Sequence, residues 1–279
     1  MSKIAVIGLV GESVFLGLER HQAVGETAHA SSIHREWGGK GYNQAVAAAR
    51  FGAEVSFLGA VGGEDVARVE IDARENGITP FLSAKDIPSA YGVITTDSEG
   101  ANRVTVYGGA VLSVSDVEKF RKEIENCDVL LISNEVPECV NIRAVEIAKE
   151  SGRLVIYNPA PARESSSYLY EACDLLTPNE FEARSLPEGL PLVITLGAEG
   201  CYIKERDLIV PPFKPERVVD TTGAGDTFNG VLAVMLARGA DIADACKAAN
   251  AAAALEVSKR FVIPAIPSGE DIRNFMGNC

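Results

Sequence analysis

The sequence predicts an α/β protein whose doubly wound, mostly parallel central sheet is flanked by helices and carries a small β-sheet lid. Short apolar runs that suit buried parallel strands alternate with longer segments of helical periodicity, as in a succession of βα units. Residues 91–107 interrupt this alternation with the pattern of a β-hairpin, which joins part of 12–36 in the lid. No long linker or repeat divides the chain. We therefore expect one domain over residues 1–279, with a discontinuous lid built from about 12–37 and 90–109.

Composition and charge restrict the partners. Of 279 residues, 47% are hydrophobic and 23% are charged, and the net charge is −13 without a Lys/Arg-rich run. We therefore expect no nucleic-acid partner. The N-terminus enters a strand directly and no apolar run approaches ~20 residues, which predicts a cytoplasmic protein without a membrane segment. The histidines match no zinc-binding spacing. The cysteines form no CxxC pair and are expected to be reduced and mostly buried: Cys127, Cys139, Cys173, Cys201, Cys246 and Cys279.

In the first half of the chain, apolar runs ended by glycine define the elements. Gly8 ends the first strand, and Gly52 and Gly77 end two helices. The Gly8–Gly11 segment lacks the GxGxxG spacing of a dinucleotide-binding turn, so we interpret it as a plain turn. The expected elements are a strand at 4–7, a strand-and-loop excursion at 12–36, a helix at 45–52, a strand at 55–58, a helix at 66–76 and hairpin strands at 91–96 and 103–107.

In the second half, strands and helices alternate again. The expected order is a helix at 114–126, a strand at 129–132, a helix at 138–151, a strand at 154–157, a helix at 164–172, a strand at 174–177, a short helix opened by 178–182, strands at 192–196, 201–204 and 208–210, a helix containing the apolar run 231–236, and helices at 242–257 and 268–276. The strands at 201–204 and 208–210 have the pattern of an antiparallel pair at a sheet edge.

Polar segments follow several of the predicted strands. In doubly wound sheets, ligands bind at the carboxyl ends of the strands, which lie along one edge. We therefore expect a single site where these segments meet: Ser133–Glu135, Asn158, Asn179–Glu182, Thr195–Gly200 and 220–226.

The segment Asp220–Gly230 carries the strongest chemical signal. Two glycines flank an alanine where a helix should begin, and Asp226 lies in its first turn. Small residues let backbone N–H groups approach a ligand closely, and a helix N-terminus attracts anions. A carboxylate beside such a cradle can take a proton from the group that attacks the anion. This segment therefore predicts a phosphoryl-transfer centre.

A second glycine-rich segment, Gly38–Gln44, lies at the start of another helix. It is not a Walker A loop, which needs GxxxxGK followed by Ser or Thr. Its glycines permit close approach of a ligand, and Asn43 can both donate and accept hydrogen bonds with hydroxyl groups. The alternative interpretation is a tight turn with a helix cap.

Both segments match a known family. The chain resembles the ribokinase-like (PfkB) carbohydrate kinases over essentially its whole length, and among them the ribokinases most. The resemblance implies a ribokinase-like fold and transfer of the γ-phosphate of ATP, with Mg²⁺, to a hydroxyl of a small sugar or sugar-like acceptor. Independently of the resemblance, the accessory sheet has an exposed face that favours a homodimer formed through the lid. The resemblance rests on Gly38–Ala49 and Asp220–Phe228, supported in the correct order by Gly25–Thr27, Asn158–Arg163, Pro178–Glu180 and Thr195–Gly197.

The resemblance also implies roles for individual residues. Asp226 is expected to be the general base, with the backbone of Gly223, Ala224, Gly225 and Asp226 as the anion hole. The acceptor is expected to contact Gly39, Lys40, Gly41, Asn43, Glu135 and Asp226. The nucleotide is expected to contact Asn179, Thr195, Gly197, Gly200, Gly225 and Asn250. Asn179 and Glu182 are expected to organise Mg²⁺, mostly through water, and Asp220 and Thr222 to lie at a K⁺ site.

The chain departs from the family pattern around the acceptor. Ribokinases carry an Asn-x-Asp pair after the first strand, where this chain has Gly11-Glu12-Ser13, and their Gly-Ala-Asn is here Gly109-Ala110-Val111. These changes favour an acceptor other than plain ribose, such as a nucleoside or another polyol, and Glu12 is a candidate replacement for the missing acid. Phe261 and Ala265 lie where the family often has the glycine and serine of the cation site. A kinase-fold binding protein and a nicotinamide-dependent oxidoreductase are the alternative functions.

Overall fold

A six-stranded parallel sheet forms the centre of the molecule. The computed structural model describes residues 1–277. The strands lie in the order β10-β9-β8-β1-β4-β5, and every neighbouring pair is parallel. The chain leaves β1 toward β4 and β5 and later returns to the other side of β1, so the winding direction reverses between β1 and β8. The strands are β1 (Lys3–Ile7), β4 (Glu54–Gly62), β5 (Ile78–Lys85), β8 (Val129–Ser133), β9 (Leu154–Asn158) and β10 (Leu175–Leu176).

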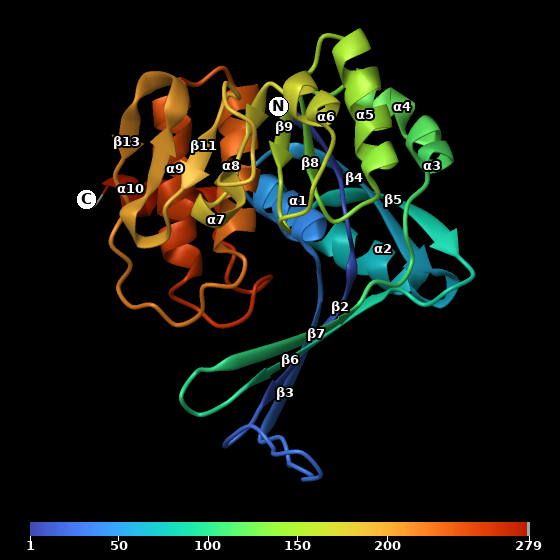
Figure 1. The fold of residues 1–279 in the computed structure, drawn as a ribbon, viewed down its shortest axis with the longest axis vertical. Coiled ribbons are helices and arrows are strands. Elements are labelled where there is room, and N and C mark those ends of the chain that lie inside the picture. Colours follow the sequence, from blue (N-terminus) through green and yellow to red (C-terminus); the bar gives the residue numbers. More distant parts are fainter. Residues whose placement is uncertain (278–279) are drawn as a thin grey trace.

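Helices cover both faces of this sheet, which confirms the doubly wound α/β fold (Figure 1). Because side chains alternate along a strand, Ile4 and Val6 enter one apolar core while Ala5 and Ile7 enter the other. The first core is covered by α1 (Lys40–Arg50), α2 (Val66–Glu75), α8 (Ala224–Ala237), α9 (Ile242–Glu256) and α10 (Gly269–Gly277). The second is covered by α3 (Val114–Lys119), α4 (Arg121–Glu125), α5 (Glu138–Glu150) and α6 (Ser167–Ala172).

Three antiparallel strands extend the edge beyond β10. Isolated parallel bridges join Leu176 to Leu192 and Asn179 to Thr195. In each bridge one partner precedes the short helix α7 (Glu180–Ala183) and the other follows it. The predicted antiparallel pair is confirmed as the last two of these strands, which are β11 (Val193–Thr195), β12 (Cys201–Ile203) and β13 (Leu208–Val210). Single 3₁₀ turns lie at Gly63–Asp65, Gly197–Glu199 and Lys204–Arg206.

A second, four-stranded sheet, here called the small sheet, projects from the main body as an arm (Figure 1). Its order is β3-β2-β6-β7, with β2 parallel to β6 and the other pairs antiparallel. In this register Ser13 lies opposite Glu36 on one side and opposite Gly92 on the other. The predicted hairpin and excursion are confirmed as its strands, β2 (Gly11–Gly17), β3 (Ser32–Gly38), β6 (Ala90–Thr96) and β7 (Asn102–Tyr107).

The start of α1 lies directly against the end of β1. A Cβ atom added to Gly8 would lie 2.5 Å from the Cα of Gly41, and one added to Gly41 would lie 2.5 Å from the Cα of Gly8. Neither position can therefore carry a side chain without moving the backbone. The turn after the first strand thus positions the N-terminus of α1 at the point where the sheet reverses its winding.

Several predicted elements need correction. Residues 114–126 form two helices with a break at buried Phe120, rather than one. The helix predicted at 164–172 begins only at Ser167, because Ser166 is extended and its hydroxyl caps the helix by accepting from the Leu169 N–H. The strand predicted at 174–177 is reduced to β10, residues 175–176. Sequence analysis missed β5 entirely, since Pro80 lies inside it; an edge strand tolerates proline.

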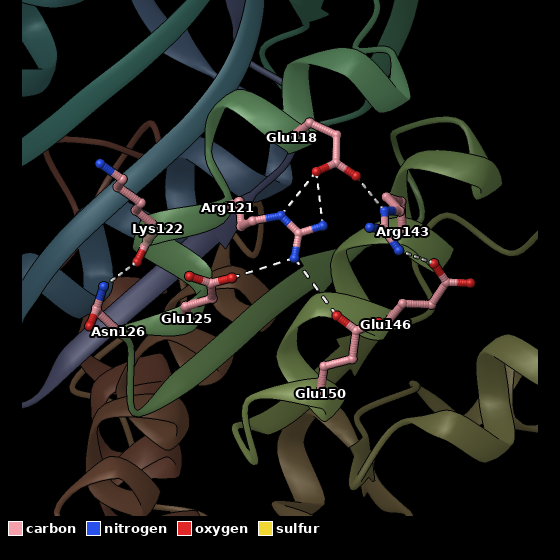
Figure 2. Close-up of polar contacts among 8 residues, drawn as sticks. All are labelled: Glu118, Arg121, Lys122, Glu125, Asn126, Arg143, Glu146 and Glu150. Atoms are coloured by element: carbon pink, nitrogen blue, oxygen red, sulfur yellow. Dashed lines mark hydrogen bonds and ion pairs between the residues drawn. The ribbon is translucent and has the colours of Figure 1, made fainter.

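The surface shared by α3, α4 and α5 carries a network of charged side chains. Figure 2 shows Arg121 between Glu118, Glu125 and Glu150, with Arg143 joining Glu118 to Glu146. This network lies on helices that cover the second core.

Burial of the cysteines follows the prediction. Cys127, Cys173, Cys201 and Cys246 are buried free thiols and Cys139 is exposed, while Cys279 lies outside the described residues. In residues 1–277, no helix is both long and apolar enough to cross a bilayer.

Candidate active site

The predicted phosphoryl-transfer segment forms the N-terminus of α8. Gly223 precedes the helix with a φ of 92°, a left-handed conformation that disfavours other residues. A Cβ at this position would also lie 2.5 Å from Cγ1 of Val262. Ala224 and Gly225 open the helix, which has no side-chain cap, and the Ala224 N–H makes only a long bond of 3.4 Å to the Thr221 carbonyl. The local sequence thus produces a bare helix N-terminus bordered by small residues.

Asp226 is buried in the first turn of α8, and side-chain amides of α1 hold both of its oxygens. Asn43 Nδ2 donates to Asp226 Oδ2 over 2.9 Å, and Gln44 Nε2 donates to Asp226 Oδ1 over 3.3 Å. Gln44 Nε2 also donates to Asn158 Oδ1 over 3.2 Å. Neighbouring positions on α1 therefore fix the direction of the carboxylate without neutralising it.

A buried polar network continues from Asn158 into the core. Asn158 Nδ2 donates to the Thr177 carbonyl over 2.8 Å, and the Thr177 hydroxyl donates to Asn229 Oδ1 over 2.5 Å. Asn229 Nδ2 in turn donates to the Gly225 carbonyl over 2.8 Å. The end of β9, the residue that follows β10 and the first turns of α8 are thereby held in one arrangement. Buried networks with satisfied partners are rigid.

Glu135 caps the N-terminus of α1. Its Oε2 accepts from the Lys40 N–H over 2.7 Å and from the Gly41 N–H over 3.4 Å. Burial, and then the negative charge of Asp226, raises the pKa of Glu135 to about 7, although Lys40 acts in the opposite direction. The pKa of Lys40 is raised chiefly by Asp226 and further by Glu135 and Glu182. Lys40 therefore lies close enough to Asp226, Glu135 and Glu182 to feel the charge of all three.

A pocket of about 340 Å³ brings many of the predicted acceptor residues together. Its walls come from the ends of β1 and β8, the N-termini of α1 and α8, and the small sheet. The volume suits a small molecule of the size of a monosaccharide or slightly larger. Of the predicted site residues it is lined by Gly39, Lys40, Asn43, Glu135, Thr222, Gly223 and Asp226.

The predicted nucleotide side lies around α7 and β11. Asn179 and Glu182 form a reciprocal cap on α7, in which Asn179 Oδ1 accepts from the Glu182 N–H and Glu182 Oε2 accepts from the Asn179 N–H, each over 2.8 Å. Burial raises the pKa of Glu182. Thr195 is bridged to Asn179, and Gly197 and Gly200 have positive φ values of 56° and 91°. Of these residues Asn179 and Gly197 are exposed and Thr195 is half-buried, whereas Glu182 and Gly200 are buried.

Asn250 has a different environment from the one expected. It is buried on α9, and its Nδ2 donates to the carbonyls of Val210 and Pro211 over 3.1 and 3.0 Å. Its amide nitrogen is thus committed to the chain that follows β13. Any contribution to nucleotide binding would come through that loop.

The predicted cation side contains an acid that sequence analysis missed. Asp220 Oδ1 accepts from the Thr222 N–H over 3.0 Å. Next to this loop, Glu256 of α9 is fully buried, and neither of its carboxylate oxygens has a hydrogen-bond partner among the described residues. Its Oε1 lies 3.0 Å from the position of a Cβ on Gly223. Burial, and then Asp220, Asp226 and Glu36, raises the pKa of Glu256 to about 9.

Sequence analysis also missed Gln44 and Glu36. Gln44 lies inside the quoted Gly38–Ala49 segment, and its place beside Asn43 was the available signal. Glu36 gave no signal, because only the register of β2 and β3 shows that it shares a face with Ser13. Glu12 is among the residues that line the pocket, but its Oε1 accepts from Arg68 over 3.2 Å and from Arg35 over 3.5 Å, so these arginines engage its carboxylate.

These features define a class of protein. A pocket at the reversal point of a doubly wound sheet, with a held carboxylate at a glycine-lined helix N-terminus, is the arrangement of a small-molecule kinase. The chain belongs to the pfkB family of carbohydrate kinases, whose family model matches residues 1–268. It is an ATP-dependent sugar kinase, which confirms the enzyme interpretation and excludes the nicotinamide-dependent alternative.

Three relatives illustrate the similarity. A ribokinase from Lactococcus lactis is 33% identical over 93% of this chain and 92% of its own length. A bifunctional ribokinase/ribose-5-phosphate isomerase A from Fructilactobacillus sanfranciscensis is 34% identical over 98% of this chain, which spans 56% of that longer protein. A ribokinase from Arabidopsis thaliana, solved with ribose and ATP, superposes with a TM-score of 0.87 at 25% identity and covers 99% of both chains.

Proposed function

We propose that this kinase transfers the γ-phosphate of Mg-ATP to a hydroxyl of a sugar-like acceptor in the 340 Å³ pocket, with Asp226 as general base. The observation that carries the proposal is the position of Asp226. Its carboxylate lines the acceptor pocket while lying in the first turn of the helix whose N-terminus would hold the phosphoryl group. A neutral sugar hydroxyl is a weak nucleophile at pH 7, so a carboxylate that accepts its proton during attack lowers the barrier.

The remaining residues of the site would position the two substrates and offset their negative charge. The N–H groups of Gly223, Ala224, Gly225 and Asp226 would form the anion hole, and Lys40 would offset charge between acceptor and nucleotide. Asn43 has an Oδ1 that is buried without a partner among the described residues, which suits a hydroxyl donor on the acceptor. Gly39 and Glu135, which line the pocket, would contact the acceptor, whereas Gly41 does not line it and would act through its N–H bond to Glu135. Asn179, Thr195, Gly197 and Gly200 would border the nucleotide, and Asn250 would contribute through the loop after β13.

The residues present fit a magnesium ion held largely by water and phosphate. Glu182 keeps one carboxylate oxygen outside the cap of α7, and Mg²⁺ prefers one or two carboxylates together with water and substrate phosphates. Within residues 1–277, no group of three or more His, Cys, Asp or Glu side chains is arranged to hold a metal ion. When bound with ATP, the ion would neutralise charge on the phosphates.

We also propose a monovalent cation, K⁺ as the first candidate, beside Asp220 and Thr222. The support is chemical: Asp220 and the buried carboxyl of Glu256, which has no hydrogen-bond partner among the described residues, lie next to the anion cradle. Burial and the neighbouring acids raise the pKa of Glu256 to about 9, and a bound cation would offset the cost of ionising it. An ion there would stabilise the loop that positions Gly223. Phe261, with a φ of 66°, and Ala265 replace the residues that the family often places at this site, so activation by K⁺ needs direct measurement.

The small sheet is proposed to be the lid of the single domain and the dimer contact. Strand β7 is an edge strand that is exposed along its whole length, including Val104, Val106 and Tyr107. An exposed apolar edge favours pairing with a second copy. Sedimentation velocity at micromolar concentration would detect the dimer, and a monomer at every concentration would contradict it.

One experiment tests the proposed reaction. ADP release is measured with Mg-ATP against ribose, deoxyribose, fructose, sugar acids, amino sugars and nucleosides, each with and without K⁺. We expect turnover with at least one uncharged acceptor, and its loss when magnesium is chelated. Absence of turnover with every acceptor, in a preparation that is protected against unfolding by Mg-ATP, would overturn the proposal and favour a kinase-fold binding protein.

A further inference from the structure

We propose that Glu36 is an acceptor-binding residue of this kinase, and that it selects an uncharged or amino-bearing polyol over sugar acids and sugar phosphates. This inference deepens the proposed function and rests on it. Glu36 lies on β3, lines the same pocket as Asp226, Asn43 and Glu135, and has a side chain that is only 7% exposed.

The register of the small sheet places this carboxylate beside Ser13 in the wall of the pocket. Ser13 and Glu36 are directly opposite residues of β2 and β3, and both line the pocket. Opposed residues of antiparallel strands share a face, with Cβ atoms about 4.5–5.5 Å apart. A Cβ on Gly38 would lie 3.0 Å from Ser13 Oγ and 3.8 Å from Asn43 Oδ1, so this face also borders the amide next to Asp226. The longer side chain of Glu36 thus supplies from β3 a carboxylate that position 13 lacks.

Neighbouring groups hold the carboxylate of Glu36 without using all of its acceptor capacity. Oε1 accepts from the Val262 N–H over 3.0 Å, and Oε2 lies 3.0 Å from His34 Nε2. His34 is itself stacked on Phe261, with ring centroids 3.8 Å apart. An ionised carboxylate offers about four acceptor positions. Two therefore remain for donors, which suits neighbouring hydroxyls or an ammonium group of the acceptor.

The charges around the pocket decide the class of acceptor. Besides Glu12, which pairs with Arg35 and Arg68, the charged residues lining the pocket in the described chain are Glu36, Glu135, Asp226 and Lys40. Even with Glu135 partly protonated near pH 7, the acids of the pocket outweigh its one ammonium, and this excess disfavours an anionic acceptor. The pocket also has apolar side chains on the small sheet, including Phe15, Ile94 and Val104. These would contact the apolar face of a sugar ring.

The test compares Glu36→Gln and Glu36→Ala with Arg35→Ala as a control. Arg35 directly precedes Glu36 on β3, so its side chain points to the opposite face of the small sheet. Both Glu36 variants should raise the acceptor KM about 10- to 100-fold, the size of losing one or two hydrogen bonds to a charged group. The KM for ATP of the Glu36 variants should stay near wild type. Arg35→Ala should keep both its acceptor KM and its KM for ATP near wild type. Glu36→Gln retains an oxygen for the Val262 N–H, so it separates acceptor binding from support of the fold.

Two further measurements complete the design. In the Glu36→Ala background, Ser13→Asp returns a carboxylate to the opposite strand and should restore part of the acceptor affinity. Acceptor binding is also followed as protection against thermal unfolding, with glucosamine, ribose and gluconate as probes, so that the result does not depend on turnover. Wild type should reject gluconate, and Glu36→Gln should reduce that discrimination.

The possible failures are distinguishable. If wild type binds a sugar but does not phosphorylate it, the proposed reaction fails while the role of Glu36 is still measured by binding. If turnover occurs and the Glu36 variants keep the wild-type acceptor KM and charge preference, the assignment of Glu36 is overturned. Equal loss of acceptor and ATP affinity in both variants would also overturn it, because that is the result of a purely structural contact with Val262. Preferential binding of gluconate by wild type would contradict the selection by charge.

Discussion

The transfer centre and the small sheet lie on opposite sides of one pocket and are built in different ways. Around Asp226, the polar side chains Asn43, Gln44 and Asn158 are buried and joined by hydrogen bonds to elements of both cores. Across the pocket, β7 is exposed along its whole length and β3 over much of it. A change at the first place disturbs the packed body, whereas a change at the second alters only what faces the acceptor. Under the proposed function, the body would therefore fix the chemistry, and the choice of acceptor could vary on the sheet.

The largest effect is expected from Asp226→Asn. The substitution keeps the volume of the side chain but removes the group that accepts the proton, so kcat should fall by at least ~10²-fold. One of the two donors, Asn43 or Gln44, would then face an amide N–H₂ group. Steady-state ADP release measures the effect, and circular dichroism with a thermal melt verifies the fold. Near-full activity in a folded preparation would refute the general-base assignment.

Alanine substitutions at two glycines of the cradle, Gly223 and Gly225, should change stability and activity in different ways. Gly223→Ala forces a left-handed φ on alanine and places its Cβ 2.5 Å from Val262, so we expect a loss of about 1–3 kcal/mol in the free energy of unfolding. Gly225→Ala meets no atom within 4 Å and lies in a helix, so stability should be unchanged or rise by up to about 1 kcal/mol.

Activity should respond to Gly225→Ala in the opposite sense from stability. The added methyl group occupies space beside the N–H groups that would hold the phosphoryl group, and we expect kcat to fall at least ~10-fold through misplacement. Urea denaturation and initial rates on the same preparation give both values. A Gly225→Ala enzyme with unchanged kcat would mean that the cradle lies elsewhere on the loop.

Much of the fold and of the transfer centre could be predicted from the sequence. Asp226, Asn43 and the glycines were found because each stands in a local pattern, a helix start with small residues. Glu36 and Glu256 were missed because their positions depend on partners far along the chain: Glu36 on the register with β2, and Glu256 on the packing of α9 against the 220–223 loop. Local patterns predicted β1, β4 and β8, whereas β5, with Pro80, forms only because β4 lies beside it.

Glu256 should make stability depend on pH. Burial raises its pKa to about 9 from 4.5, so the folded state binds more protons than the unfolded state between those values. The free energy of unfolding therefore falls as pH rises through this window. Glu256→Gln removes the titration and should flatten the profile, with the clearest difference from pH 7 to 9, where the similar contribution of Glu135, with its pKa of about 7, is largely complete. Thermal melts across that range test it, and parallel profiles for both proteins would contradict it.

The smallest effect is expected from Arg121→Ala in the surface network of Figure 2. Arg121 contacts Glu118, Glu125 and Glu150 over 2.9, 3.4 and 3.7 Å, which is more charged partners than Asp226 has amide donors. Those partners are exposed, however, and water and salt screen such pairs. We expect kcat and both KM values to stay at wild type and the melting temperature to fall slightly, with the difference shrinking in 1 M salt. The helices α3 to α5 cover the core that does not contain α8. A change in kcat would therefore show that the two faces of the sheet are coupled. It would also show that the transfer centre depends on the surface more than its buried network implies.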